Sequence, residues 1–147
     1  MAKRLKIYFA CAIKGNPDGV DEKKLVVTTI QDLGHLVLSE IFASDGNVNV
    51  KNGRVLNPLQ IYQRDMKWVK GADIIVAEVS RPSLGVGYEV AWGISLGKRV
   101  VALCKKENLE TLSFMFRGNN AKKFKLCIWK NEKDLKNILE KELERLK

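Results

Sequence analysis

The stretch ADIIVAEVSRPSLGVGYEVAWG, residues 72–93, decides the fold. Its first part is an apolar run with the length of a buried strand, its middle is a turn rich in Ser, Pro and Gly, and its last part has the pattern of a helix. One carboxylate, Glu89, stands in that helix beside the apolar Val86 and Val90. Either this side chain is solvated at the surface, or the helix places its carboxylate in a functional site.

The alternation of strand and helix continues on both sides of this stretch. Strand-like apolar runs occur at Leu5–Cys11, Leu36–Ile41, Asp73–Val79, Arg99–Cys104 and Phe124–Trp129. Helical patterns occur at Asp21–Leu33, Pro58–Lys70, Val86–Leu96, Leu109–Phe116 and from Asn131 to the C-terminus. This alternation predicts an α/β fold with a doubly wound, mainly parallel five-stranded sheet of flavodoxin-like or Rossmann-like type.

In such a sheet, ligands bind beyond the carboxyl ends of the strands. The longest irregular segment, Ala43–Asn57, is rich in Gly, Asn and Asp. We expect it to form a mobile loop or a small hairpin over the site.

Length and composition predict a single domain over residues 1–147. The three cysteines are an odd number without paired spacing, and the short apolar run at the N-terminus fits neither a signal peptide nor a membrane span. We therefore expect a cytoplasmic protein without a membrane partner. The net charge of +9 comes from scattered lysines without interleaved aromatic residues, which favours solubility or heat-adapted ion pairs over polynucleotide binding.

Asp65 is the first candidate catalytic residue. In the helix NPLQIYQRDMKWVKGAD, residues 57–73, apolar side chains at three- and four-residue spacing define the face that meets the sheet, and Asp65 falls on that face. A buried Asp can cap a loop or pair with Arg64 or a lysine. Otherwise its pKa is raised among apolar groups, so that it can donate a proton near neutrality.

Glu89 is the second candidate. Ser83, Gly85 and Gly87 belong to the turn after the third strand, so the start of the next helix and its free backbone N–H groups point into the crevice. We expect the helix dipole to keep Glu89 ionised and Asp65 to hold the proton. Two carboxylates with opposite pKa tuning suit glycosidic bond cleavage, in which one protonates the leaving group and the other meets the oxocarbenium-like carbon.

Other motifs are incomplete. The segment GVGYEV has two glycines of a dinucleotide-binding loop, but Val90 replaces the third, and the first loop, residues 11–19, is neither that motif nor a Walker motif. That loop is either a phosphate nest that uses Lys14 and Gly15, or a plain flexible loop. No metal or other cofactor is expected, because one histidine with scattered cysteines cannot assemble a zinc site, and His35 is expected at the surface or at an edge.

Four segments together resemble a known family. They are IYFACAIKG at residues 7–15, IYQRDMKWVKGADIIVAEV at 61–79, RPSLGVGYE at 81–89 and LSFMFRG at 112–118. They closely resemble the 2'-deoxynucleoside 5'-phosphate N-hydrolases, also called Rcl, of the nucleoside 2-deoxyribosyltransferase superfamily. The resemblance covers most of the chain from Leu5 to about Lys125 and implies hydrolysis of the N-glycosidic bond of 2'-deoxynucleoside 5'-monophosphates.

The resemblance also implies roles for individual residues. Glu89 attacks or stabilises C1' of the deoxyribose, Asp65 assists departure of the base, and Tyr8 orients Glu89. Ile61 and Met115 flank the base. The substrate-binding residues at and around the 5'-phosphate are Cys11, Ile13, Lys14, Gly15, Ser83, Gly85 and Gly87, together with Ser113 from the partner in a homodimer.

The chain departs from the family pattern in the first loop. Family members often have Gly and Ser where this chain has Cys11 and Ala12, and Arg where it has Lys14. Ala12 removes a hydroxyl donor, and Lys binds phosphate without the bidentate fork of Arg. Two alternatives therefore stay open, namely a nucleoside 2-deoxyribosyltransferase that moves deoxyribose between bases, and a nucleotide-binding regulatory module without turnover.

Overall fold

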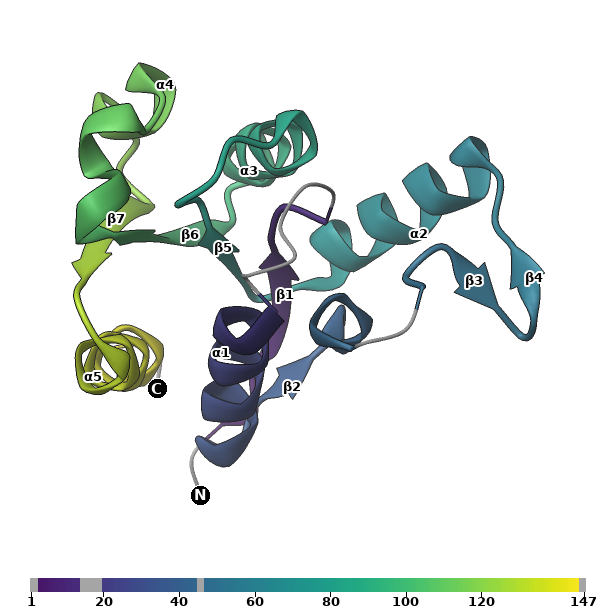
Figure 1. The fold of residues 1–147 in the computed structure, drawn as a ribbon, viewed down its shortest axis with the longest axis horizontal. Coiled ribbons are helices and arrows are strands. Elements are labelled where there is room, and N and C mark those ends of the chain that lie inside the picture. Colours follow the sequence, from purple (N-terminus) through teal and green to yellow (C-terminus); the bar gives the residue numbers. More distant parts are fainter. Residues whose placement is uncertain (1–2, 14–19, 45–46, 146–147) are drawn as a thin grey trace.

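The computed structural model describes residues 3–13, 20–44 and 47–145. Its central sheet has five parallel strands, which are β1 (Lys6–Ala10), β2 (Leu36–Val37), β5 (Ile74–Glu78), β6 (Arg99–Lys105) and β7 (Phe124–Trp129). Their spatial order is β2-β1-β5-β6-β7 (Figure 1). This is the doubly wound, flavodoxin-like order that the sequence predicts.

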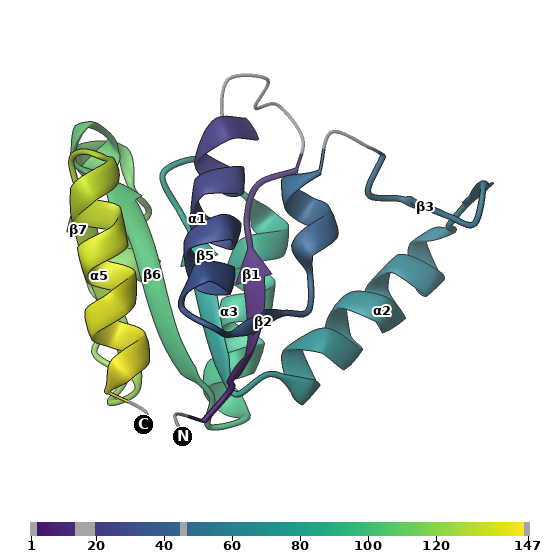
Figure 2. The ribbon, with the colours of Figure 1, turned by 90° about the horizontal axis from the view of Figure 1, so that it is seen from below.

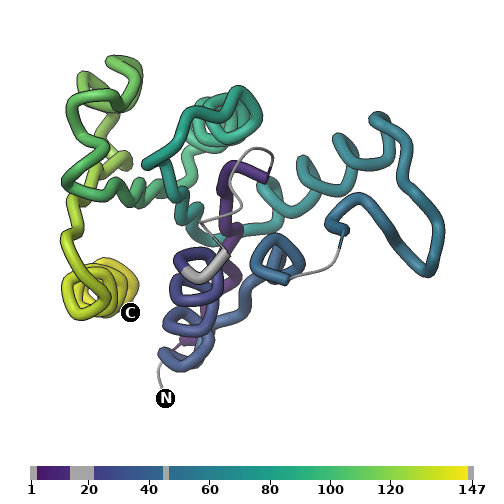
Figure 3. The backbone as a smooth tube through the Cα atoms, in the orientation of Figure 1, coloured from purple at the N-terminus to yellow at the C-terminus, as the bar shows by residue number. Residues whose placement is uncertain are grey.

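Helices cover both faces of the sheet. Helices α1 (Val20–Asp32) and α5 (Glu132–Glu144) pack together on one face, whereas α2 (Pro58–Gly71) and α3 (Leu84–Ser95) pack on the other (Figures 1 and 2). The trace in Figure 3 shows the helices that follow β1 and β5 on opposite sides of the sheet. The carboxyl ends of β1 and β5 therefore form the switch point, where a ligand site is expected.

The second strand is shorter than the predicted Leu36–Ile41. It ends at Val37 and is followed by the 3-10 helix η2 (Glu40–Ala43). The Oγ atom of Ser39 accepts a hydrogen bond from the backbone N–H of Phe9 and donates one to the Phe9 carbonyl, both at 2.8 Å. A side chain thus replaces strand pairing at the upper end of β1.

The predicted helix Leu109–Phe116 is divided into two short helices. They are the 3-10 helix η3 (Lys106–Thr111) and α4 (Phe114–Arg117). The break lies at Ser113, whose Oγ accepts a hydrogen bond from the backbone N–H of Met115 at 3.2 Å and so caps α4.

The segment Ala43–Asn57 contains a small hairpin, one of the two predicted possibilities. Strands β3 (Val50–Lys51) and β4 (Arg54–Val55) are joined by Asn52 and Gly53 with φ values of 52° and 74°. An Asn-Gly pair in the left-handed region is the preferred two-residue hairpin turn. The hairpin extends beyond the start of α2 (Figure 1).

The predicted helices Asp21–Leu33, Pro58–Lys70 and Val86–Leu96 agree with α1, α2 and α3 within two residues at each end, and the last predicted helix starts within one residue of α5, which ends at Glu144. His35 is buried at 5% exposure, and its Nδ1 accepts a hydrogen bond from the backbone N–H of Leu5 at 3.3 Å. The expected exposure of His35 is therefore wrong, although it does precede the edge strand β2. Within the described part of the chain, no helix combines the length and the apolar character that crossing a membrane requires.

Candidate active site

A cavity of about 590 Å³ opens at the carboxyl ends of β1 and β5. Its walls come from the segment after β1, the turn after β5, the first half of α3, one side of α2 and residues 48–49 before the hairpin. Seven of the predicted site residues line it, namely Cys11, Ile13, Ile61, Asp65, Ser83, Gly85 and Glu89. The fold thus brings together residues from four separate segments of the chain.

Three other predicted residues lie elsewhere. Gly87, Ser113 and Met115 line a second groove of about 710 Å³, between α3 and the segment that contains η3 and α4. The two spaces share the turn after β5, including Ser83. Lys14 and Gly15 lie outside the described residues, so the expected phosphate nest does too.

Glu89 projects from the second turn of α3. The helix begins at Leu84, and the Oγ atom of Ser83 accepts a hydrogen bond from the backbone N–H of Val86 at 3.3 Å. Burial raises the pKa of Glu89 to about 7, against the lowering effects of the Tyr8 hydroxyl and the Arg64 guanidinium. The expectation that the helix dipole keeps this carboxyl ionised is wrong, because the dipole acts mainly within the first turn and desolvation outweighs it.

Asp65 lies on the inner side of α2. The helix starts with a capping box in which Asn57 and Gln60 exchange side chain to backbone hydrogen bonds, each 2.9 Å long. The side chain of Asp65 is 14% exposed, and its Oδ1 accepts a hydrogen bond from Nε of Arg64 at 2.8 Å. Burial raises the pKa of Asp65, and Arg64 opposes that effect.

The structure therefore realises both predicted possibilities for Asp65, burial on the apolar face and pairing with Arg64. The raised pKa of Asp65 agrees with the predicted division between the two carboxyls, whereas the raised pKa of Glu89 does not. Glu89 is driven to a pKa near neutrality, whereas Asp65 keeps a cationic partner. With a pKa of about 7, Glu89 is partly protonated at neutral pH.

Tyr8 is fully buried beneath the two carboxyls. Burial, and then the nearby charges of Glu89 and Asp65, raise the pKa of its hydroxyl far above the ordinary value. The hydroxyl interacts with Glu89, and among the described residues only it and Thr29 Oγ1 are fully buried side-chain oxygens without a partner inside ordinary hydrogen-bond limits. A small movement of Glu89 would give the Tyr8 hydroxyl a hydrogen-bond acceptor.

Sequence reasoning did not assign Arg64, Val48 and Asn49 to the cavity wall. Arg64 was considered only as a possible partner of Asp65. The sequence does place Arg64 four residues before Trp68, a spacing that puts two side chains next to each other on a helix. In the structure the guanidinium of Arg64 lies over the Trp68 ring. Within the described residues, no group of three His, Cys, Asp or Glu side chains could hold a metal ion.

Comparisons with known proteins identify the family of the chain and agree with its fold. The family model described as nucleoside 2-deoxyribosyltransferase matches residues 7–136. A Danio rerio protein named 5-hydroxymethyl-dUMP N-hydrolase is 36% identical over 143 residues, which cover 97% of this chain and 98% of the relative. A Thermofilum pendens protein, named provisionally as 2'-deoxynucleoside 5'-phosphate N-hydrolase 1, is 35% identical over 85% of each chain.

The fold is also found among solved structures. The CMP N-glycosidase BcmB of Clostridium botulinum superimposes with a TM-score of 0.67 over 93% of this chain and 98% of its own, at 20% identity. At that identity the likeness concerns the fold alone. The match over residues 7–136, together with the two relatives, establishes that the chain belongs to the nucleoside 2-deoxyribosyltransferase family.

Proposed function

We propose that this protein hydrolyses the N-glycosidic bond of 2'-deoxynucleoside 5'-monophosphates and releases the free base and 2-deoxyribose 5-phosphate. The observation that carries the proposal is the meeting of Asp65 and Glu89 at one cavity of about 590 Å³, above the buried Tyr8. This volume lies within the range of small-molecule sites. The names of the two relatives also support it, because both are N-hydrolases of deoxynucleotides.

In the proposed reaction the bond between C1' and the base nitrogen breaks, and water finally supplies the new oxygen at C1'. Glu89, when ionised, attacks C1' or stabilises the oxocarbenium-like state, and Asp65 delivers a proton to the departing base. Tyr8 orients Glu89 by donating its free hydroxyl hydrogen. The 2'-deoxy sugar suits this chemistry, because no electron-withdrawing 2'-hydroxyl destabilises the positive charge at C1'.

The 5'-phosphate is proposed to lie at the turn after β5 and the first loop. Ser83 and Gly85 line the cavity at the start of α3, where backbone N–H groups without helical partners favour an anion. Lys14 and Gly15 would complete the site. This part of the proposal predicts faster cleavage of monophosphates than of unphosphorylated deoxynucleosides or matching ribonucleotides.

The test incubates purified protein with deoxynucleoside monophosphates, with and without an acceptor base, and separates the products by chromatography. The proposal expects free base and sugar phosphate without an acceptor. Product that forms only with the acceptor would instead show a deoxyribosyltransferase. Binding without either product would show a nucleotide-binding module. Equal kcat/KM with and without the phosphate would show that the phosphate site has been lost.

We further propose that the active unit is a homodimer in which Ser113 completes the phosphate pocket of the partner. Ser113 caps α4 as a hydrogen-bond acceptor, so its own hydroxyl hydrogen stays available to donate. The neighbouring Phe114 and Met115 are each 81% exposed. Exposed apolar side chains of this size favour burial against another subunit.

The homodimer is tested by mixing two inactive variants, Glu89→Gln and Ser113→Glu, under conditions that allow subunit exchange. If sites are shared, one pocket of a mixed dimer carries both changes and the other carries neither, so activity returns. If each pocket is built from one chain, every pocket carries a change. A mixture that stays inactive, with exchange verified by native mass spectrometry, would contradict the shared site.

We also propose a cytoplasmic location. Its support is that Cys11, Cys104 and Cys127 are free, buried thiols, as is usual in a reducing compartment. Recovery of the native protein outside the cytosolic fraction of its cells would contradict this location.

A further inference from the structure

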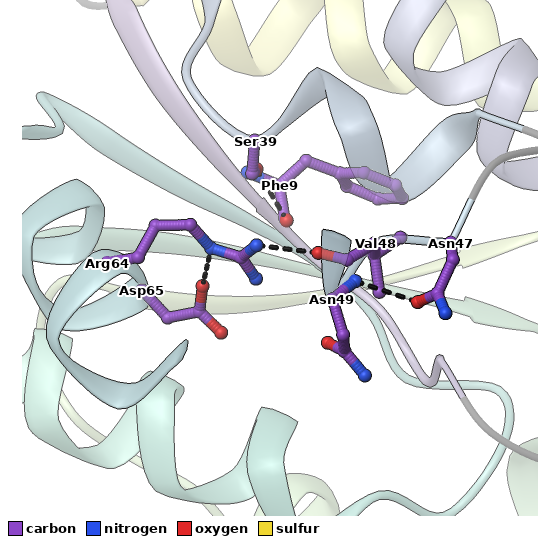
Figure 4. A network of polar contacts seen from close by, with 7 residues as sticks. All are labelled: Phe9, Ser39, Asn47, Val48, Asn49, Arg64 and Asp65. Atoms are coloured by element: carbon purple, nitrogen blue, oxygen red, sulfur yellow. Dashed lines mark hydrogen bonds and ion pairs between the residues drawn. The ribbon is translucent and has the colours of Figure 1, made fainter. Parts of the chain in front are cut away.

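At the edge of the cavity, the guanidinium of Arg64 contacts four other residues. Its Nε donates to Oδ1 of Asp65 at 2.8 Å, and its Nη1 donates to the backbone carbonyl of Val48 at 2.6 Å (Figure 4). The guanidinium carbon lies 4.9 Å from the ring centroid of Trp68 and 5.7 Å from that of Phe42. Two nitrogen atoms of the group are thus paired with an acid and a carbonyl, while two aromatic rings pack against the guanidinium.

The segment to which Arg64 donates its hydrogen bond forms part of the cavity wall. Val48 and Asn49 both line the cavity. The backbone N–H of Asn49 is bound by the side chain of Asn47 at 2.9 Å, and the carbonyl of Asn49 accepts a hydrogen bond from Leu56 at 2.7 Å. These hydrogen bonds lie within residues 47–56, at the base of the hairpin. The bond from Arg64 to the Val48 carbonyl connects this segment to α2.

The aromatic support of Arg64 extends to the proposed catalytic residues. The rings of Phe42 and Trp68 meet edge to face with centroids 5.9 Å apart, and Tyr8 contacts both, at 6.2 Å and 6.5 Å. Packing of this kind fixes the plane of the guanidinium. Arg64 is thereby connected to Tyr8 through packing and to Asp65 through a hydrogen bond.

We infer that Arg64 is a positioning residue that locks the carboxylate of Asp65 and the Val48–Asn49 wall of the cavity into one rigid unit. This inference rests on the proposed function for its effect on catalysis, but its structural part does not. Arg64 acts through its neighbours, because its Nε and Nη1 donate to protein atoms and its guanidinium packs against the rings of Trp68 and Phe42. No other group among the described residues is bonded to both Asp65 and the segment before the hairpin.

The charge of Arg64 has a second consequence. It lowers the pKa of Asp65 and, at longer range, that of Glu89, against the raising effect of burial at both sites. Among the described residues, the charged and titratable groups that interact with these two carboxyls are Arg64 from α2, Tyr8 from β1, Cys11 just after β1, and each carboxyl itself. Loss of the guanidinium charge therefore raises both carboxyl pKa values and moves the whole pH profile of kcat/KM to higher pH.

The experiment compares Arg64→Gln, Arg64→Lys and the matched control Lys67→Gln, which removes a positive charge from an exposed position one turn along α2. Backbone hydrogen exchange over residues 47–56 is measured by mass spectrometry, and kcat, KM and the pH profile are measured with a deoxynucleoside monophosphate. Urea unfolding of each variant verifies that it is folded.

We expect faster exchange over residues 47–56 in both Arg64 variants, because a lysine cannot bridge Asp65 and Val48 with one planar fork. We expect kcat to fall about tenfold to hundredfold in Arg64→Gln, as for a misplaced catalytic group. Its pH profile should move to higher pH, whereas the charge in Arg64→Lys should restore the profile. Lys67→Gln should match the wild type in every measurement.

Unchanged exchange over residues 47–56 in Arg64→Gln would overturn the inference, whatever the activity. So would a pH profile identical to that of the wild type. If the wild type releases no base from any deoxynucleotide, the proposed function fails, and the exchange measurement alone still decides whether Arg64 holds the segment.

Discussion

At the scale of single residues, the site is organised around a buried hydroxyl and two carboxyls. Tyr8 is at 0% exposure, and its hydroxyl has no hydrogen-bond partner among the described residues. Such a group costs about 1–3 kcal/mol of stability. A tyrosine at this position is explained in spite of this cost if its hydroxyl orients Glu89 during the reaction.

Tyr8→Phe tests this explanation. The change removes an unpaired polar group without leaving a cavity, so the variant should be as stable as the wild type or more stable in urea unfolding. The rate of base release should nevertheless fall by about tenfold or more, because Glu89 loses its orienting donor. A variant that is much less stable, or fully active, would show that the hydroxyl has only a packing role.

Glu89 makes the activity dependent on pH. Because Glu89, whose pKa burial raises to about 7, acts in its ionised form and Asp65 acts in its protonated form, kcat/KM should rise with pH and then fall again. The nearby Asp65 contributes to the raised pKa, so Asp65→Asn should move this rise to lower pH. The residual activity of Asp65→Asn is measured between pH 5 and 9. If its rise with pH occurs at the same pH as in the wild type, or at a higher pH, the role assigned to Glu89 is contradicted.

Sequence reasoning identified both carboxyls but not the order of their pKa values. Asp65 was found because it interrupts an apolar helical face, and Glu89 because it follows a glycine-rich turn. The burial of Glu89 depends on how α3 packs against its neighbours, which periodicity does not reveal, whereas the pairing of Asp65 with the adjacent Arg64 was among the possibilities that the sequence offered.

At the scale of elements, the position of Glu89 depends on how closely α3 packs on β5. Gly93 is buried in α3, and a Cβ atom there would lie 2.1 Å from Cδ1 of Ile75, which is itself at 0% exposure. The helix approaches the strand this closely only because Gly93 has no side chain. The same contact sets the height of Glu89 above Tyr8.

Gly93→Ala should therefore push α3 away from the sheet. We expect a loss of about 1–3 kcal/mol of unfolding free energy, typical of overpacking, together with a reduced rate of base release. The control is Gly71→Ala at the end of α2, where nothing lies within 4 Å of the added Cβ. The control should stay within about 1 kcal/mol of the wild type. Equal stability of the two variants in urea would refute the close contact.

The elements themselves were largely predictable from sequence. Long periodic segments such as α2 and β7 agree with the structure within one residue, because capping and burial act locally. The prediction failed where a tertiary contact replaced a local preference. Ser39 ends β2 early by bonding to Phe9, and Ser113 divides the predicted helix Leu109–Phe116.

At the scale of the whole molecule, the C-terminal helix is fastened to the sheet by a buried carboxylate. Glu142 in α5 is 2% exposed and forms ion pairs with Arg99 of β6, Lys125 of β7 and Arg145. Lysine and glutamate alternate along the sequence of this helix, and such alternation is typical of a solvated face. That interpretation is wrong for Glu142, because alternation along a sequence does not show which charge turns inward.

The pKa of Glu142 is lowered, since its cationic partners outweigh the raising effect of burial. A carboxyl whose folded pKa lies below its unfolded pKa stabilises the fold above the unfolded value and loses that contribution as pH falls through the folded value. Glu142→Gln should therefore lose at least about 1 kcal/mol at pH 7. The difference from the wild type should shrink below the ordinary Glu pKa of 4.5.

Urea unfolding at pH 7 and at pH 3.5 measures this difference, with Glu140→Gln as the control at an exposed position of α5. A loss for Glu142→Gln that is equal at both pH values would show that the ion pairs do not stabilise the fold.

The central claim is that Glu89 and Asp65 together cleave a deoxynucleotide at the cavity between β1 and β5. The most direct measurement is the rate of base release from a 2'-deoxynucleoside 5'-monophosphate by the wild type, Glu89→Gln and Asp65→Asn, each verified as folded. We predict equal amounts of base and 2-deoxyribose 5-phosphate from the wild type, almost no product from Glu89→Gln, and a loss of about 10²–10⁴-fold for Asp65→Asn. A rate for Glu89→Gln close to that of the wild type would contradict the claim.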